Sequence, residues 1–377
     1  MAAYDVIVIG VGAMGASTCY ALARRGVRVL GLEQFDIPHA LGSSTGFSRM
    51  IRMAYYEHPD YVPLLKRAYE LWDKLEKASG QKLLHLTGGL YMGPPGGEVV
   101  SGSLASARRH GLPHELLDRA QLAERFPQFQ LPDDWAALYE PRAGFLLPEK
   151  VIAAYADLAL RAGAEIHGRE PVLQWHADEK GVTVRTPRGE HAAAHLVFAG
   201  GAWSGSLLQD LGITLQVTRQ VMGWVWPREP GQFALGQFPV WAIDNPTGGL
   251  DYGFPMHPEN PGLKIAHHAP AQPTDPNTVA REILPGDEET FRPALRRYLP
   301  AGDGPLLSLR MCLYTNSPDH HFIIDHHPRH DRVTLACGFS GHGFKFASVM
   351  GEVLADLATQ GTTGLPIGFL GLGRFRE

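Results

Sequence analysis

The sequence has few cysteines, no long apolar run and no basic tract. Its three cysteines, Cys19, Cys312 and Cys337, make an odd number without Cys-x-x-Cys spacing, which argues against a disulfide framework and a structural zinc site. No uninterrupted apolar segment could span a bilayer. The 34 Lys and Arg residues are spread against 39 Asp and Glu residues, so there is no electrostatic footprint for nucleic acid or an anionic membrane. These absences leave small-molecule chemistry as the expected class of function, with neither nucleic acid nor membrane as a partner.

The composition is that of an ordinary globular protein. Hydrophobic residues make up 44% and charged residues 19% of the 377 residues. At roughly 100 to 200 residues per domain, the chain should form about two domains. The N-terminal stretch MAAYDVIVIGVGAMGAS lacks a basic lead-in, and its glycines interrupt any signal-peptide core. We therefore expect a cytoplasmic protein.

A nucleotide-binding unit opens the sequence. Residues 4–9 form a short β-rich run, GVGAMG follows, and a helical segment leads into a second apolar run, VRVLGLE. In such a unit Gly10 permits a tight turn, Gly12 lets the backbone approach a pyrophosphate, and Gly15 lets the helix pack on the strand. Glu33 ends the second strand, where a carboxylate accepts hydrogen bonds from ribose hydroxyl groups. The pattern favours a dinucleotide over a structural glycine turn, but it does not separate FAD from NAD.

The whole chain predicts an α/β fold with two discontinuous domains. The pieces at 1–85, 145–215 and 305–377 alternate strand and helix patterns, and we assign them to a Rossmann-like nucleotide-binding domain. The pieces at 86–144 and 216–304 are broken by Pro and Gly, which is typical of a mostly antiparallel β-sheet, and we assign them to a substrate domain. Ligands are expected in the cleft between the two domains.

Two arginines could form a carboxylate-binding fork. Arg49 and Arg52 are three residues apart in GFSRMIRMAYY, so one helical turn would point both guanidinium groups the same way. Spacing alone leaves two solvated arginines as an equal alternative.

A second set of candidates is Tyr252 in DYGFP, Lys264 and His268 in GLKIAHH, and Lys345 in GFSGHGFKF. A lysine can hold a carboxylate or stabilise negative charge developing on oxygen, and a histidine can tune charge in a pocket. For each lysine alone, a surface position is the commoner reading. Gly341 and Gly343 flank a histidine and indicate a close approach of the backbone to a ligand.

The histidine-rich stretch DHHFIIDHHPRH, at residues 319–330, could suggest a metal site. However, FIID resembles a strand, on which neighbouring side chains alternate between faces rather than converge. Solvated loop histidines are therefore favoured, and we assign no metal.

The cysteines differ in context. Cys19 falls in the first helix and Cys337 precedes a glycine loop, so packed thiols are expected at both positions, with a reactive thiol as the alternative at Cys337. Cys312, in RMCLYTNSPD, is undecided, because a lone cysteine is usually structural unless a cofactor makes use of it.

Taken together, these motifs resemble the monomeric sarcosine oxidase and N-methyltryptophan oxidase family, within the flavoproteins of the D-amino-acid oxidase type. The resemblance runs from YDVIVIGVGAMG through PHALGSSTGFSRMIRMAYYEHPDYVPLLKRAYELWDKLE, YGFP and GLKIAHH to CLYTNSPDHHFIID and GFSGHGFKFASVMGEVLADLA, and it covers nearly the whole chain. Motifs of this length are far more specific than a glycine loop. They imply that the dinucleotide is FAD.

The resemblance also implies how FAD is held. Cys312 would carry the flavin through a thioether to its 8α-methyl group, because a thiolate is a soft nucleophile. The implied cofactor-binding residues are Gly10, Gly12, Gly15, Glu33, Ser43, Arg49, Val172, Trp203, Cys312, Gly341, Gly343 and Lys345.

The family gives the substrate side its implied roles. Arg52 and Lys345 would bind the substrate carboxylate, and Tyr252 and His268 would line the substrate pocket. The implied catalytic residues are Arg49 against the flavin ring, Lys264, Tyr252 and His268. Lys264 would lie where oxygen reacts, its positive charge stabilising superoxide.

One stretch departs from the family pattern. After GS, the family's best-known members read His-His-Gly-Asp-Thr-Arg, whereas this chain has Ser-Thr-Gly-Phe-Ser-Arg at residues 44–49. Thr45 removes an imidazole that is expected near the flavin, and Phe47 replaces a carboxylate. We expect this departure to affect flavin tuning and the preferred amine more than the fold.

The predicted activity is FAD-dependent oxidation of a small secondary amino acid, sarcosine or another N-methyl amino acid. Hydride transfer to the flavin, hydrolysis of the imine and reoxidation by O2 would yield H2O2. One alternative is an amine dehydrogenase of the same fold that uses another electron acceptor and needs no working Lys264. The other is a non-catalytic FAD-binding protein. A monomer is expected.

Overall fold

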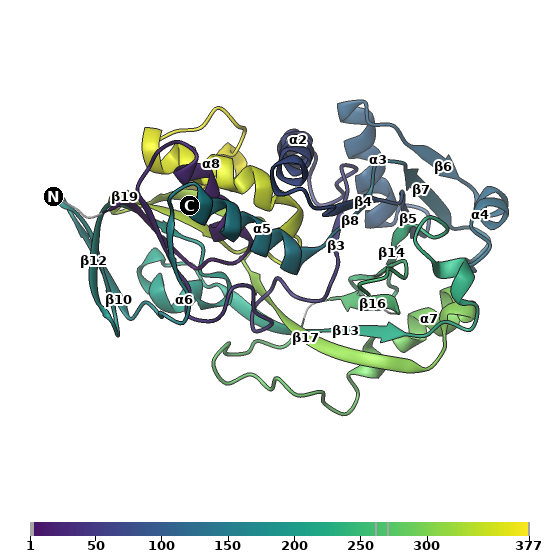
Figure 1. Cartoon of the computed structure of the whole chain (residues 1–377). Helices are drawn as coiled ribbons and strands as arrows, with labels where there is room; N and C mark the ends of the chain where they lie inside the picture. The colour runs from purple at the N-terminus through teal and green to yellow at the C-terminus, as the bar shows by residue number, and fades with distance from the viewer. Residues whose placement is uncertain (1–3, 261, 270, 376–377) are drawn as a thin grey trace.

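The computed structural model describes residues 4–260, 262–269 and 271–375, which form two large β-sheets, a small third sheet and the helices that pack on them (Figure 1). Because strands from distant parts of the sequence alternate between the sheets, each half of the molecule is built from several pieces of chain.

The first sheet has a parallel centre that begins near the N-terminus. Its strands are, in spatial order, β10 (Gln174–Asp178), β11 (Gly181–Thr186), β12 (Gly189–Phe198), β1 (Tyr4–Ile9), β2 (Val29–Leu32) and β9 (Glu165–His167), with β19 (His330–Cys337) beside β12 and β18 (Ile323–His327) beside β19. β1 pairs in parallel with β2 and β12. Val6, Ile7, Val8 and Ile9 of β1 are all buried, as expected for a strand covered on both faces. The predicted Rossmann-like arrangement is confirmed.

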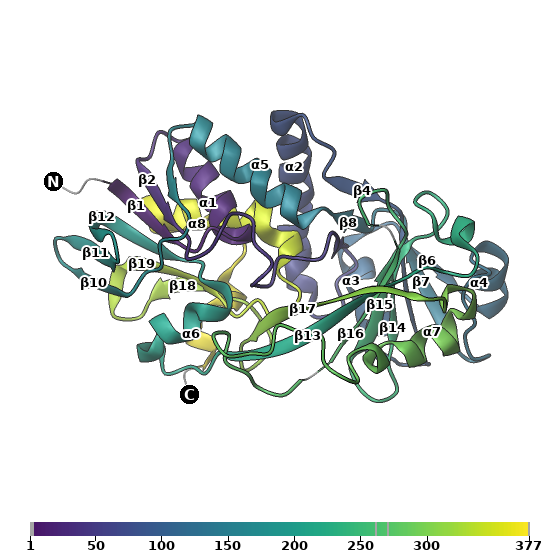
Figure 2. The same ribbon diagram turned by 60° about the horizontal axis from the view of Figure 1, so that its bottom comes forward.

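Four helices lie together beside this sheet: α1 (Ala13–Ala23), α2 (Val62–Ser79), α5 (Pro148–Arg161) and α8 (Ala347–Gln360) (Figure 2). α1 packs against both α5 and α8. In α2 the buried residues Leu65, Ala68, Trp72 and Leu75 recur at intervals of three or four, so they form one apolar stripe that faces the core.

The second sheet has the order β17 (Leu306–Asn316), β13 (Gln216–Val225), β16 (Leu263–His268), β15 (Leu250–Phe254), β14 (Val240–Asp244), β5 (Gly89–Gly93), β7 (Ala136–Glu140) and β6 (Glu115–Leu117). Neighbouring strands are antiparallel except β5 and β14, so the predicted mostly antiparallel sheet is confirmed. The helices on this half are α3 (Glu98–His110), α4 (Arg119–Arg125) and α7 (Arg292–Tyr298). A separate apolar cluster, which includes Phe129, Phe233 and Trp241, forms its core.

Strands β13 and β17 connect the two halves of the molecule (Figure 2). They pair from Gln216 with Asn316 to Val225 with Leu306. The predicted boundary at residue 305 assigned β17 to the nucleotide-binding domain, whereas β17 is the edge strand of the second sheet. The difference arises because local sequence pattern does not reveal which strand is the pairing partner.

A third, small sheet consists of β3 (Arg49–Ile51), β8 (Gly144–Leu146) and β4 (Leu84–Leu86), with β8 in the middle. The short helix α6 (Ser204–Leu207) follows β12. In the described part of the chain, every helix is too short or too polar to cross a bilayer.

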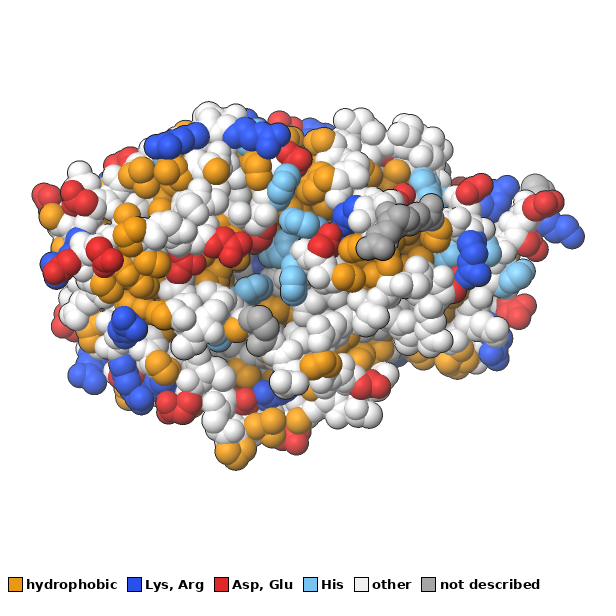
Figure 3. All heavy atoms as spheres, turned by 180° about the vertical axis from the view of Figure 1, so that it is seen from behind, with side chains coloured by type: hydrophobic (Ala, Val, Ile, Leu, Met, Phe, Trp, Pro, Cys, Tyr) orange, Lys and Arg blue, Asp and Glu red, His pale blue; other side chains and the backbone are white. Residues whose placement is uncertain are grey.

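Charged side chains of both signs are mixed on the surface. On the face drawn in Figure 3, blue Lys and Arg side chains alternate with red Asp and Glu side chains, and histidines gather near its middle. Neither sign of charge dominates this face.

Candidate active site

A cavity is lined by both large sheets. Most of the predicted site residues line it: Gly10, Gly12, Glu33, Ser43, Arg49, Arg52, Val172, Trp203, Tyr252, His268, Cys312, Gly341, Gly343 and Lys345. Gly15 and Lys264 are not among the lining residues. The fold thus brings together in one cavity residues that are more than 300 positions apart in sequence, such as Gly10 and Lys345.

The loop between β1 and α1 has the geometry of a phosphate-binding turn. A Cβ on Gly15 would lie 1.7 Å from the carbonyl oxygen of Gly10, so only glycine lets α1 start this close to β1. A Cβ on Gly12, in contrast, would have nothing within 4 Å, which leaves open space beside the first turn of α1. Backbone N–H groups and the positive end of the helix dipole favour a phosphate there.

Two backbone hydrogen bonds orient the Glu33 carboxylate and leave it able to accept further hydrogen bonds. Its side chain accepts hydrogen bonds from the backbone N–H groups of Val11, at 2.9 Å, and Phe35, at 3.1 Å. Each carboxylate oxygen keeps a second lone pair, which suits the hydroxyl groups of a ribose. The ring of Trp203, which also lines the cavity, lies 5.1 Å from that of Phe35.

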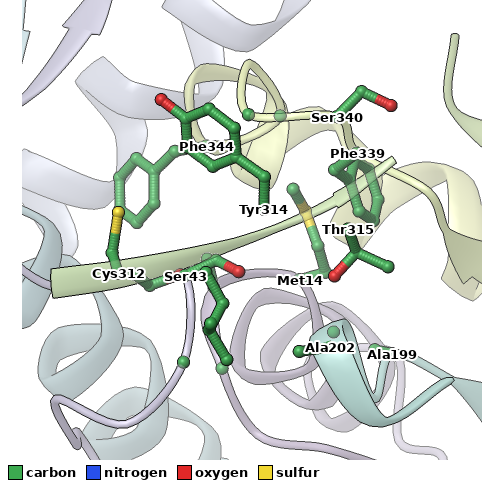
Figure 4. A pocket seen from close by; sticks show the side chains of 18 of the residues that line it. Met14, Ser43, Ala199, Ala202, Cys312, Tyr314, Thr315, Phe339, Ser340 and Phe344 are labelled. Atoms are coloured by element: carbon green, nitrogen blue, oxygen red, sulfur yellow. The ribbon is translucent and has the colours of Figure 1, made fainter. Parts of the chain in front are cut away.

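Strand β17 carries four cavity residues, of which Cys312, Tyr314 and Thr315 are labelled in Figure 4. Cys312 and Tyr314 point to one side of the strand and Thr315 to the other, as alternation along a strand requires. Among the described residues, Oγ1 of Thr315 has no hydrogen-bond partner although it is buried. An unpaired hydroxyl in a cavity wall indicates a ligand group that completes it. With the open turn at Gly12, this observation fits a bound FAD.

The Cys312 thiol is 1% exposed. Burial raises its pKa, whereas the positive charges of Arg49 and Lys264 act to lower it. These two cations are therefore the groups that would favour a thiolate at this position.

The predicted carboxylate-binding arginine is paired with an acid of the protein itself. Nη2 of Arg52 donates to both carboxylate oxygens of Glu57 at 2.6 Å, and the Arg52 guanidinium lies 4.3 Å from the ring centre of Tyr55. Although burial opposes it, the positive charge of Arg52 lowers the pKa of Glu57 to about 2. Arg52 is 5% exposed, so any substrate carboxylate must compete with Glu57 for it.

Lys345 is the second buried cation beside this pair. Its side chain is 5% exposed and Nζ donates to the backbone oxygen of His342 at 2.8 Å. Burial, reinforced by the positive charge of Arg52, lowers the pKa of Lys345 to about 7. Near neutral pH this ammonium group therefore loses its proton easily.

The part of the cavity formed by β15, β16 and β17 is aromatic and uncharged. Nδ1 of His268 lies 3.2 Å from the hydroxyl group of Tyr314. Burial lowers the pKa of His268 to about 4, so its imidazole is neutral at pH 7. Burial also raises the pKa of Tyr252. A neutral, aromatic wall suits the apolar substituent of a small amine.

Arg49 does not form a helical fork with Arg52. Arg49 lies in β3, where it pairs with Leu146 of β8, so the predicted helical turn is wrong. Its Nη1 and Nη2 donate to the backbone oxygens of Ser48, at 3.0 Å, and Ser43, at 2.9 Å. Both arginines nevertheless line the same cavity.

Lys264 lies behind the cavity wall. Its side chain is fully buried, and Nζ donates to the backbone oxygens of Gly46 and Ser48, at 2.8 and 2.7 Å, and to Oγ of Ser48, at 3.2 Å. Burial lowers the pKa of Lys264 well below its usual value, and Arg49 acts in the same direction. The three oxygen acceptors favour the ammonium form against this effect.

The residues that depart from the family pattern form the turn that holds Lys264. Glu149, in the first turn of α5, accepts hydrogen bonds from the backbone N–H groups of Gly46, at 2.7 Å, and Phe47, at 3.2 Å, and from Oγ1 of Thr45, at 3.4 Å. Phe47 has a φ of 65°. The carboxylate thus fixes the turn whose backbone oxygens bind Lys264.

Four side chains near the site are not predicted from the sequence: Glu57, Glu149, Tyr314 and Thr315. Tyr314 carries a usable signal, because it is two residues from Cys312 on a strand and so shares its face. Glu57 and Glu149 carry no such signal in the sequence, because their roles depend on contacts with Arg52 and with Gly46 that only the fold creates.

The fold and the cavity are those of a flavoprotein oxidoreductase. The family of FAD dependent oxidoreductases matches residues 5–357, and the chain belongs to this family. Among curated proteins it is 44% identical over 368 residues to monomeric sarcosine oxidase of Streptomyces avermitilis, covering 97% of this chain and 96% of that one. It is 37% identical to N-methyl-L-tryptophan oxidase of Citrobacter koseri, covering 99% and 100%.

A solved structure supports the same assignment. NikD, an unusual amino acid oxidase essential for nikkomycin biosynthesis, superposes with a TM-score of 0.85 at 27% identity and covers 98% of both chains. The protein is thus a flavin-dependent oxidoreductase that acts on CH–NH groups.

Proposed function

We propose that the protein oxidises a small secondary amino acid, sarcosine or another N-methyl amino acid, and returns the electrons to O2 with release of H2O2. The observation that carries the proposal is the position of Arg52 and Lys345, two buried cations that line the same cavity as the nucleotide loop. The relatives named above act on sarcosine and N-methyl-L-tryptophan, both of which carry a carboxylate beside the amine.

Different cavity residues bind the two ends of the substrate and so fix its orientation. Arg52 and Lys345 bind the carboxylate, and the neutral wall at Tyr252 and His268 receives the N-methyl end. Gly12 and Glu33 would hold FAD, which would supply the group that accepts a hydride and passes electrons to O2. Fixing the carboxylate places that carbon in one orientation, which makes the transfer effectively intramolecular. Because the curated relative from S. avermitilis is a monomeric oxidase, we propose that this chain also acts as a monomer.

The direct test is an anaerobic titration of the purified protein. Sarcosine and a series of other N-methyl amino acids are mixed with it without oxygen, and the flavin absorption is followed. We expect one of them to bleach the band, and admission of air to restore it with release of H2O2. Bleaching that only an artificial acceptor reverses would indicate a dehydrogenase, and no bleaching by any amine would refute the proposal.

Carboxylate binding should weaken as the pH rises through about 7. Because burial lowers the pKa of Lys345 to about 7, its charge is present below that pH and lost above it. The dissociation constant of acetate, measured from the shift in the flavin spectrum, should rise by up to about tenfold per pH unit above 7. The Lys345→Met variant should bind acetate weakly with no step near this pH. An unchanged step in that variant would assign the titration to another group.

Replacing Glu57 should strengthen carboxylate binding. In Glu57→Gln the internal competitor for Arg52 is neutral, so acetate should bind about tenfold more tightly, which corresponds to about 1.4 kcal/mol. The variant should also melt at a lower temperature, because it leaves a buried arginine without its partner. Arg52→Met is the matched control and should weaken binding. If both variants weaken binding equally, Glu57 positions Arg52 instead of competing for the ligand.

A further inference from the structure

Two groups of potential metal ligands lie outside the cavity in the part of the chain that the structure describes. One consists of Asp210, His327 and His330, and the other of His167, Glu170 and His191. In each group the potential ligand atoms all lie within 4.8 Å of one another. Their hydrogen bonds distinguish them.

The first group is unsuited to a metal. His327 and His330 do converge, with ring centres 4.8 Å apart, although the sequence pattern predicted that these histidines would not. However, Nδ1 of His327 accepts a hydrogen bond from the backbone N–H of Arg329, so the ring proton lies on Nε2, which faces Asp210 at 3.2 Å. A metal at Nε2 would require the proton to move to Nδ1, and this would break the hydrogen bond from Arg329.

The second group is arranged around a buried carboxylate. Glu170 lies in the segment after β9, and its side chain is fully buried. One of its oxygens is 2.8 Å from Nδ1 of His167, at the end of β9, and the other is 2.8 Å from Nε2 of His191, in β12. The two histidine side chains are 25% and 18% exposed, so an ion can reach them from solvent.

Outer hydrogen bonds orient two of these side chains, His167 and Glu170. Nε2 of His167 is 2.7 Å from Glu165, which in turn accepts a hydrogen bond from the Tyr4 hydroxyl group at 2.8 Å. Oγ1 of Thr186 donates to Glu170 at 2.7 Å. A carboxylate on the far nitrogen of a histidine fixes its tautomer and raises its basicity, and this arrangement recurs behind metal-bound histidines.

We propose that Nδ1 of His167, Nε2 of His191 and the carboxylate of Glu170 form a binding site for Zn²⁺ or a similar divalent transition metal. A set of two imidazoles and one carboxylate binds such ions in preference to Ca²⁺ or Mg²⁺. Nδ1 of His167 faces Glu170 at 2.8 Å and Nε2 faces Glu165 at 2.7 Å, so a metal at Nδ1 would replace the first contact and leave the second in place.

Bound metal would secure the segment that leads into the nucleotide site. The backbone N–H of Glu170 donates to the backbone oxygen of Glu33 at 2.8 Å, and Val172, two residues later, lines the cavity. The ion would therefore join β9, β12 and this segment beside the place predicted for the adenosine. Its role is structural, since it is separate from the cavity residues that would bind the substrate.

One neighbouring cation gives the proposal a distinctive test. Nη1 of Arg188 lies 3.3 Å from the Glu170 carboxylate and its side chain is 56% exposed. Arg188 thus partly neutralises the Glu170 carboxylate, whose negative charge would attract a metal ion. Removing it should strengthen metal binding, whereas removing a ligand should weaken it, and a purely hydrogen-bonded cluster would show neither effect.

The experiment is calorimetric titration of ZnCl2 into the flavin-containing protein, prepared without a histidine tag and freed of metal with a chelator. We expect one site that is lost in His191→Ala, weakened roughly 10- to 100-fold in Glu165→Gln, and tightened several-fold in Arg188→Ala. His330→Ala, from the rejected group, should bind zinc as the unaltered protein does. Flavin retention in each variant shows that it has folded.

Two kinds of result would contradict the proposed zinc site. Absence of zinc binding by the unaltered protein, or zinc binding that His191→Ala leaves unchanged, would show that these residues form only a hydrogen-bonded cluster. Loss of binding in His330→Ala but not in His191→Ala would place the ion in the other group. The titration does not depend on the amine oxidised, so its failure leaves the proposed function untouched.

Discussion

Lys264→Met should slow the reaction of the reduced protein with oxygen by roughly 10²- to 10³-fold, the usual effect of removing one preorganised electrostatic group. The proposed role of Lys264 is to place a positive charge where superoxide would form. The Lys264 side chain is fully buried and close enough to Arg49 for the two positive charges to interact, and burial strengthens the field of its ammonium group. The rate is measured by mixing substrate-reduced protein with oxygenated buffer in a stopped-flow instrument.

Lys345, the other buried lysine near the site, provides a matched control. Lys345→Met removes a cation of similar burial, but we expect it to slow reduction by the amine and to leave the reaction with oxygen nearly unchanged. The two variants should therefore have opposite effects on the two half-reactions. Equal slowing of both half-reactions in Lys264→Met would contradict the assignment and would indicate a general disturbance of the flavin site.

Cys312→Ser should release the flavin completely when the protein is denatured. If Cys312 tethers the cofactor, the unaltered protein keeps its yellow colour after acid precipitation, whereas the variant leaves the colour in the supernatant. Cys312 is suited to this role because it lines the cavity with Arg49, and because the charges of Arg49 and Lys264 act against the rise in its pKa that burial causes. The measurement is the flavin absorption of the pellet and of the supernatant.

Cys337→Ser is the control for this prediction. Cys337 is also fully buried, but it does not line the cavity. Its replacement should leave the colour with the pellet. Free flavin in the supernatant of the unaltered protein would show that the cofactor is held without a covalent bond, and Cys312 would then be a packed thiol.

Much of the fold could be predicted from local pattern. The β-rich run at residues 4–9, the three glycines and Glu33 lie within one strand–helix–strand unit, where backbone sterics and short-range hydrogen bonds determine the structure. The antiparallel half was also predictable in kind. The membership of β17 was not, because its pairing with β13 connects residues about 90 positions apart in sequence, from Val225 with Leu306 to Gln216 with Asn316.

Site residues could be predicted where the residue type determines the chemistry. They could not be predicted where a contact made by the fold determines it. Arg52, Lys345 and Cys312 stand out as chemistry-bearing residues in long motifs, and the fold brings all three into one cavity. The helical fork of Arg49 and Arg52 failed, because pairing with β8 imposes an extended backbone on Arg49. Glu57 was not predicted, because a glutamate between a tyrosine and a histidine looks in sequence like any solvated acid.

By itself, then, the sequence determined the nucleotide-binding unit, the α/β class and the cations that could meet a carboxylate, because these depend on residue type and on neighbours along the chain. Only the tertiary structure decided which charges are buried together. It paired Arg52 with Glu57, placed Lys345 where burial lowers its pKa to about 7, and surrounded Lys264 with backbone oxygens. Desolvation and pairing are properties of the packed molecule, and no local pattern encodes them.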